Sequence, residues 1–338
     1  MCLTAPVTEK TRERKLLMLV LAVVLMTVPG LILTAMGLNS LVSVWSMGSI
    51  AGFVALMSGG PRVAAVVVPA LLVLMPVASW WSGSPWLGGA ILTVAAVAAA
   101  YPARWSRNTG TNWALITLAF AVADPPDLGH AWTAGDYLLI GAVAALAALW
   151  GIGMAAAGGS RGPTTPSEGV GPNRALAFAL IKAATIGATG WAVIDLNLGL
   201  AGAWMIMTVI LVVQPSFGDT WSRTLQRAAG TFAGFVLAFV VGVVIPWGVV
   251  VYLVGTLFLV AALVLRTKGV TYWRYVTFMT PSVVLMEGAN GAVISTDFER
   301  LGATLVGVAI SLGVVAIMRP LHQAIGPAKP EPSSGQSS

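Results

Sequence analysis

Four basic side chains stand at or near membrane depth in segments that are otherwise apolar. Lys182 lies about two turns inside one such segment, and Arg223 and Arg227 are four residues apart, which places them on one face of a helix. Arg300 directly precedes the last apolar segment. Charged residues inside membrane segments are rare and are functional candidates by default, and guanidinium groups bind carboxylates with paired hydrogen bonds. The pattern therefore favours a path for a small anionic solute.

Each of these residues also has a simpler interpretation. The long stem of Lys182 could carry its ammonium group to the cytoplasmic interface, and the arginine pair could only anchor the topology. Arg300 could pair with Glu287 or Asp297, and acids at that helix start are stabilising without any substrate. The sequence leaves these alternatives open.

Other chemistries find little support in the sequence. The only cysteine is Cys2, and the two histidines, His130 and His322, have no partner at a metal-ligand spacing. No phosphate-binding loop or nucleophile motif is present. We therefore expect no enzyme, no catalytic residue, no metal and no cofactor. The net charge of +6 comes from basic residues spread singly between apolar segments, which is typical of membrane topology signals rather than of nucleic-acid binding.

The elements that would position these residues are membrane helices. The chain has 57% hydrophobic and only 9% charged residues, with a mean hydropathy of +0.88, so it is predicted to be an all-α polytopic membrane protein in contact with the lipid bilayer. We count about 12 transmembrane segments, at residues 16–37, 41–57, 63–79, 86–101, 113–123, 137–157, 175–194, 200–213, 228–245, 247–265, 272–286 and 301–318.

These segments divide the chain into five regions. They are a cytoplasmic N-terminus (1–15), a first six-helix unit (16–157), a flexible cytoplasmic linker (158–173), a second six-helix unit (174–320) and a disordered cytoplasmic tail (321–338). With both termini in the cytoplasm, 17 of the 18 Lys and Arg residues lie on or near the cytoplasmic side, and Arg300 is the exception. This bias predicts a multi-pass protein of the plasma (inner) membrane in that orientation.

The two six-helix units correspond at a nearly constant offset. Trp45 and Trp204 differ by 159 residues, and Arg62 and Arg223 by 161. Because six is even, a duplicated unit enters the membrane with the same orientation twice, which predicts two parallel repeats. The fifth segment of each unit is unusual, since 113–123 is short and 272–286 contains Pro281. Short or Pro-broken segments at matching positions indicate a transporter's binding region, although an ordinary tilted helix would read the same way.

A basic corner links two segments of the second unit. The apolar run after Trp204 ends at Gln214 and Pro215, and the two arginines follow. We interpret this corner as the inner mouth of a transport path. Small residues at Gly230, Gly234, Gly302 and Gly307 are expected to serve close helix packing. The 13 tryptophans fall largely at segment ends, as an interfacial belt does.

The second unit resembles the integral-membrane domain of the fusaric acid resistance and aromatic acid exporter family. The resemblance covers roughly residues 176–320 and rests on the Gln214-Pro215 corner, the arginine pair with its glycines, Thr280-Pro281 and Arg300 with Thr304 and Gly307. It implies a six-helix unit that is paired within a chain or as a homodimer, and efflux of aromatic or other weak organic acids. It also makes Gln214, Pro215, Thr280 and Pro281 candidate path residues. The first unit departs from the pattern, because Leu139 stands where the offset would place an arginine.

The sequence therefore predicts an exporter of small, aromatic organic anions. A passive anion channel would use the same basic mouth, and a non-transporting membrane scaffold of the cell envelope would use the arginines for topology alone. A transporter of the major facilitator type also has six plus six segments, but the loop Ser58-Gly59-Gly60-Pro61-Arg62 lacks that family's pattern.

Overall fold

The computed structural model describes residues 17, 21, 24–25, 28–38, 40–159, 169–215, 217–267, 270–287 and 293–325. The predicted N-terminus (1–15), most of the linker (160–168) and the end of the tail (326–338) lie outside the described residues. Of the first predicted segment, residues 28–35 are helical.

The described chain is a bundle of helices, and no strand occurs within these ranges. The first half comprises α2 (Ser40–Val54), continued by a π-helical turn η1 (Ala55–Gly59), then α3 (Pro61–Trp80), α4 (Pro85–Ala100), a 3₁₀ turn η2 (Tyr101–Trp105), α5 (Asn108–Ala123) and α6 (Ala134–Ala157). The second half comprises α7 (Pro172–Asp195), α8 (Gly199–Val212), α9 (Phe217–Val244), α10 (Gly248–Thr267), α11 (Tyr272–Glu287) and α12 (Val293–Ile325). The all-α class is thus shown.

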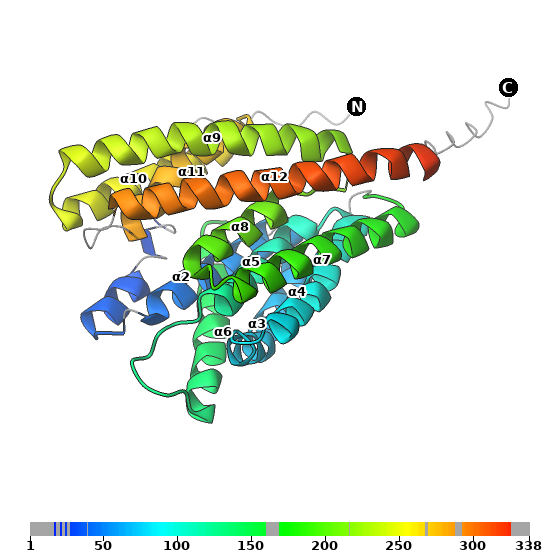
Figure 1. The fold of residues 1–338 in the computed structure, drawn as a ribbon. Coiled ribbons are helices and arrows are strands. Elements are labelled where there is room, and N and C mark those ends of the chain that lie inside the picture. Colours follow the sequence, from blue (N-terminus) through cyan, green and yellow to red (C-terminus); the bar gives the residue numbers. More distant parts are fainter. Residues whose placement is uncertain are drawn as a thin grey trace, which may run out of the picture.

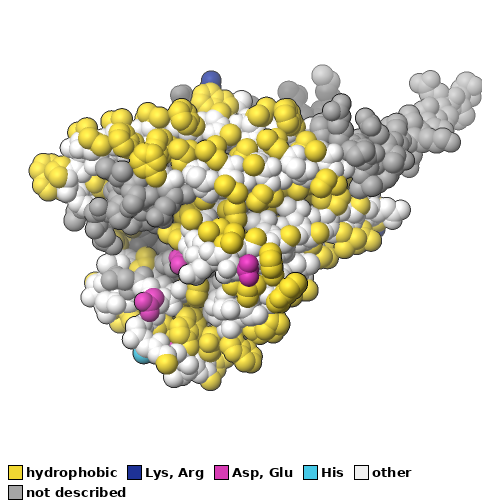
Figure 2. Space-filling model, viewed as in Figure 1, with side chains coloured by type: hydrophobic (Ala, Val, Ile, Leu, Met, Phe, Trp, Pro, Cys, Tyr) yellow, Lys and Arg dark blue, Asp and Glu magenta, His cyan; other side chains and the backbone are white. Residues whose placement is uncertain are grey.

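Seven helices are long and apolar enough to cross a membrane, and two shorter apolar helices accompany them in the described part of the chain. The face drawn in Figure 2 is covered largely by hydrophobic side chains with few charged ones, as contact with lipid requires. The chain is therefore a multi-pass membrane protein. The count of 12 crossings stays a prediction.

The helices form two groups that meet along α8 (Figure 1). In the first group α6 packs on α2 and α3, while α5 contacts α2, α3 and α4. In the second, α9 and α10 both pack on α11, and α12 packs on α8 and α9. Helix α7 belongs to the second half of the sequence but packs mainly on α4 of the first group.

Helix α5 is the most enclosed helix of the first group. It has only 16 residues, about 24 Å at 1.5 Å per residue, and most of its side chains are buried. Its apolar part was predicted to begin at Trp113, but the helix begins at Asn108. The additional turn carries Thr109 and Asn112 into the bundle.

Two predicted boundaries in the second half are corrected. Helix α9 begins at Phe217 rather than at 228, so the basic corner is only a few residues long and both arginines are helical. Helix α12 begins at Val293, which places Arg300 two turns inside the helix instead of at its start. Pro281 does not end its segment, since α11 continues from Tyr272 through it to Glu287.

Candidate functional site

A pocket lies where the two groups of helices meet. It encloses about 760 Å³ of empty space, including space that is open to solvent. Helices α2 and α5 of the first half form one wall, and α8, α9, α11 and α12 form the others. The lining residues are Met47 and Ile50; Thr109, Asn112 and Trp113; Trp204, Met207, Leu211 and Gln214; Arg223 and Arg227; Tyr272, Tyr275, Met279 and Val283; and Arg300.

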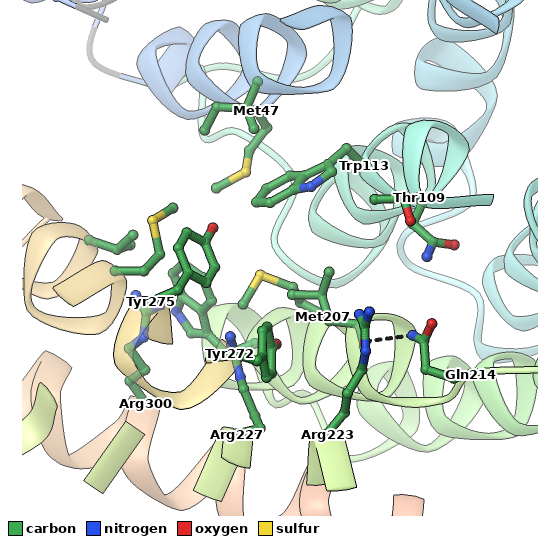
Figure 3. A pocket seen from close by; sticks show the side chains of 16 residues that line it. Met47, Thr109, Trp113, Met207, Gln214, Arg223, Arg227, Tyr272, Tyr275 and Arg300 are labelled. Atoms are coloured by element: carbon green, nitrogen blue, oxygen red, sulfur yellow. Dashed lines mark hydrogen bonds between the residues drawn. The ribbon is translucent and has the colours of Figure 1, made fainter. Parts of the chain in front are cut away.

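Three arginines line this pocket along one side. Figure 3 shows Arg300, Arg227 and Arg223 in that order, with Met47 and Trp113 on the opposite side. Arg227 and Arg300 are each only 3% exposed, whereas Arg223 is half-buried. No Asp or Glu side chain is among the described residues that line the pocket. The charged side chains among the described lining residues are therefore all arginines.

The pocket is elongated parallel to the helices that form it. One face of α8, with the residues that follow the helix, lines about 15 Å of the pocket's length. The lining residues on this face are spaced three or four apart: Trp204, Met207, Leu211 and Gln214. Arg300 stands at the Trp204 end and Arg223 at the Gln214 end, in the region of Tyr272. The three arginines are therefore spread along the length of the pocket.

Aromatic rings provide flat surfaces beside the cations. The guanidinium carbon of Arg300 lies 4.0 Å from the ring centroid of Trp204, and that of Arg223 lies 5.6 Å from the ring of Tyr272. Both distances are within the range of cation–π attraction. Trp204 is fixed from behind by an edge-to-face contact with Phe120, at 4.9 Å and 86°. The indole N–H of Trp204 and the hydroxyl of Tyr272 are buried and have no hydrogen-bond partner among the described residues.

Gln214 closes the end of α8 as well as lining the pocket. Pro215 prevents the helix from continuing, which leaves its last carbonyls without backbone partners. The Gln214 amide Nε2 donates to the carbonyls of Leu211 (3.0 Å) and Val213 (3.3 Å). Thr220 on α9 accepts from the Gln214 N–H (2.9 Å) and donates to its carbonyl (3.1 Å). The predicted corner is thus a hydrogen-bonded junction of α8 with α9.

Lys182 lies beside the pocket, inside the protein. The expectation that its stem reaches the interface is wrong, because the side chain is 0% exposed. Its Nζ donates to the Ile210 carbonyl (2.8 Å), another of the unpaired carbonyls of α8, and to the Asn112 Oδ1 (3.1 Å). It also faces the Phe178 ring at 5.5 Å. Lys182 therefore touches a lining residue without lining the pocket itself.

The remaining predicted path residues lie outside the lining. Pro215 forms the corner, and Thr280 and Pro281 face α9, where a Cβ on Gly234 would lie 2.6 Å from the Thr280 Cβ and 3.0 Å from the Pro281 Cδ. The predicted partners of Arg300, Glu287 and Asp297, have side chains outside the described residues.

The glycines differ in what surrounds them. Gly230 and Gly234 are at the contact of α9 with α11, and Gly307 is at the contact of α12 with α8, where a Cβ would lie 2.8 Å from Thr208. At Gly302 a Cβ would meet no atom of the described residues within 4 Å, so these residues give the packing prediction no support there. The sequence reasoning missed a tighter seam in the first half, between Gly48 and Gly52 of α2 and Gly151 of α6; the Gly-x-x-x-Gly spacing of the first two signals it.

Most of the pocket's first-half wall was also missed. Met47, Thr109, Asn112 and Trp113 were not predicted as path residues, and neither were Tyr272 and Tyr275. Two of their helices did carry a signal, because α5 and α11 contain the short segment and the Pro281 segment that were predicted to mark a binding region. The described site is thus a pocket between the two halves of a membrane helical bundle, lined by arginine and aromatic side chains.

Comparison with known proteins gives a family match in the second half of the chain. Residues 176–314 match the fusaric acid resistance protein-like family, which confirms the predicted resemblance for the second half of the chain. The inner membrane protein YccS of Escherichia coli (strain K12) is 27% identical over 155 residues, which are 44% of this chain and 20% of that protein. The chain thus aligns with about a fifth of this relative. No solved structure matches.

Proposed function

We propose that this protein transports small organic anions, aromatic carboxylates in particular, across the plasma membrane through the pocket between its halves. The proposal rests on the site's chemistry. The family resemblance of the second half favours the same function, and the name of its relative, an inner membrane protein, favours the same location.

The observation that carries the proposal is the state of Arg227. This guanidinium is almost fully buried, lines the pocket and has an Nε without a hydrogen-bond partner among the described residues. A buried charge without compensation is costly, and a buried donor without a partner adds to the cost. A carboxylate in the pocket would supply both the charge and the acceptors.

The shape and lining of the pocket favour a flat, partly apolar anion. Trp113, Tyr272 and Tyr275 line the pocket together with methionine and aliphatic side chains. An aromatic ring could lie against these surfaces while its carboxylate meets an arginine. Direction follows from the predicted orientation: Arg223 and Gln214 face the cytoplasm, and an inside-negative membrane potential favours outward movement of an anion.

Uptake and efflux of labelled benzoate by proteoliposomes tests the proposal. Arg227→Gln removes the charge-assisted hydrogen bonds, which are worth about 1.5–3 kcal/mol, so the apparent affinity should fall by about 10- to 150-fold. Arg62→Gln and Arg274→Gln are matched controls, because both arginines are exposed and neither lines the pocket. These two variants should transport as the wild type does.

The same assay separates the competing functions. Saturable flux that is accelerated by unlabelled benzoate on the opposite side of the membrane indicates a carrier, whereas non-saturating flux with single-channel currents indicates a channel. No flux above that of empty vesicles for benzoate and related carboxylates, from protein that remains folded, would overturn the proposal and favour a scaffold.

A further inference from the structure

Lys182 is a buried ionisable group that the pocket's own chemistry does not use. It lies ten residues after the first residue of α7, about 15 Å along the helix. Its side chain has no exposed surface, and its Nζ is held by the Ile210 carbonyl and the Asn112 amide oxygen. Both partners are neutral acceptors. They can hold either an ammonium group or a neutral amine.

The elements around Lys182 supply no negative charge among the described residues. Helices α4, α5 and α8, which all contact α7, contain no charged residue, and the turn η2 contributes only Arg104 and Tyr101. On α7 itself, Arg174 and Asp195 are eight and thirteen residues away, about 12 and 20 Å along the helix. The charged side chains that line the adjacent pocket are, among the described residues, all arginines. An ammonium group here is therefore surrounded by neutral or positive groups.

The link to the pocket runs through Asn112. Asn112 accepts from the Lys182 Nζ at 3.1 Å and itself lines the pocket. A carboxylate in the pocket would thus be separated from the Lys182 nitrogen by little more than one amide group. At such a distance, in surroundings of low dielectric constant, a single negative charge stabilises an ammonium group appreciably.

We propose that Lys182 takes up one proton from solvent when the pocket binds an anion, and releases it when the pocket empties. This inference rests on the proposed function. The balance is simple: the neutral amine, a proton and the carboxylate become an ammonium–carboxylate pair, and no covalent bond other than N–H is made or broken. Lys182 acts as a positioning and charge-compensating residue rather than as a direct ligand.

Linkage gives the sign of the effect. If binding takes up a proton, the affinity for an ionised carboxylate is highest at low pH and falls as the pH rises through the titration range of the free protein. One coupled proton allows a decrease of up to about tenfold per pH unit. Benzoate stays ionised throughout, so the change reports the protein.

The experiment measures equilibrium binding of labelled benzoate to the full chain in nanodiscs between about pH 6 and pH 9. The wild type should lose affinity with rising pH. Lys182→Arg keeps the charge at every pH, so its affinity should be high and flat. Asn112→Asp gives Lys182 a fixed carboxylate partner, so its affinity should be lower and flat. His130→Gln is the control, because that histidine is exposed and lines no part of the pocket, so the variant should keep the wild-type profile.

The outcomes separate the two proposals. A wild type that binds benzoate with the same affinity at every pH overturns the role of Lys182 alone, as does an unchanged pH profile in folded Asn112→Asp protein. A profile that disappears in His130→Gln also overturns it. A folded wild type that binds no benzoate at any pH overturns the proposed function itself. If Lys182→Arg does not fold, the Asn112→Asp result decides, since aspartate is nearly isosteric with asparagine.

Discussion

Trp204 makes two contacts through one indole ring, a cation–π contact with Arg300 and an aromatic contact with Phe120. One face of its indole carries the Arg300 guanidinium at 4.0 Å, and its ring meets Phe120 of α5 edge to face. The ring therefore fixes the position of an arginine on α12 relative to the first half of the chain.

Replacing the Trp204 indole should weaken anion binding, and more so when the new side chain has no aromatic ring. Trp204→Leu loses the cation–π contact, about 0.5–2 kcal/mol, and should reduce benzoate affinity by about 2- to 30-fold. Trp204→Phe keeps an aromatic face and should retain most of the affinity. Trp80→Leu is the control, because Trp80 is exposed at the end of α3 and lines no part of the pocket. Equal affinities of the Leu variant and wild type, measured by benzoate binding, would contradict this role of the ring.

The sequence located the charged part of the site and missed its apolar part for one physical reason. Arginine is so unfavourable in lipid that its presence at membrane depth is informative by itself, and Arg223, Arg227 and Arg300 all line one pocket. Met47, Trp113 and Tyr275 are compatible with lipid, with helix packing and with a binding site. Only tertiary contacts decide which of these surfaces a given apolar residue faces.

At the level of elements, close contact between helices depends on particular glycines. A Cβ on Gly151 of α6 would overlap the Ser49 carbonyl oxygen of α2 and lie 2.9 Å from the Phe53 nitrogen. Gly153, two residues later, meets no atom within 4 Å. The same helix thus contains one glycine that packing requires and one that it does not.

This pair allows a matched test of the α2–α6 contact. Gly151→Ala should push the helices apart and cost about 1–3 kcal/mol, the usual cost of overpacking. Gly153→Ala should be neutral or stabilise by up to about 1 kcal/mol through helix propensity. The unfolding midpoint in detergent, followed by circular dichroism, should therefore fall in Gly151→Ala. In Gly153→Ala it should stay the same or rise. A similar loss in both variants would mean that the contact is not the cause.

Hydropathy predicted where most helices lie in the sequence, but it did not predict the residues at which several of them begin. The predicted segments after the first each coincide with a helix, because runs of apolar residues this long have few alternatives. The ends failed where polar residues are buried by neighbours. Helix α5 includes Asn108 and Asn112, and α9 includes Arg223 and Arg227, because tertiary partners and the pocket accommodate side chains that hydropathy assigns to loops.

On the scale of the whole molecule, corresponding helices make corresponding contacts. The pairs α2–α6, α3–α6, α3–α5 and α4–α5 of the first half are matched by α8–α12, α9–α12, α9–α11 and α10–α11 of the second. Within the pocket, Met47 and Met207 face in from opposite halves at an offset of 160 residues, and so do Asn112 and Tyr272. These correspondences support the predicted repeat, with the pocket near its axis. The arginines that line the pocket all belong to the second half, so the two copies would contribute different chemistry to it.

The predicted orientation requires that the short helix α5 cross the membrane. At about 24 Å it is shorter than a hydrocarbon core of about 30 Å, and it is buried among other helices rather than in lipid. If α5 crosses, the segment before it, with Arg104, and the segment after it, with Ala131, lie on opposite sides. If it does not, both lie on one side and the count of 12 fails.

Cysteine labelling tests this directly, because Cys2 is the only cysteine in the sequence. In the wild type, a membrane-impermeant maleimide should reach Cys2 only after the membrane is permeabilised. In a Cys2→Ser background, Ala131→Cys should be labelled in intact cells and Arg104→Cys only after permeabilisation; both positions are exposed in the structure. This result would place Arg223 and Gln214 at the cytoplasmic end of the pocket and Arg300 toward the outside. Labelling of both engineered cysteines from the same side would show that α5 does not cross, and the direction proposed for transport would lose its basis.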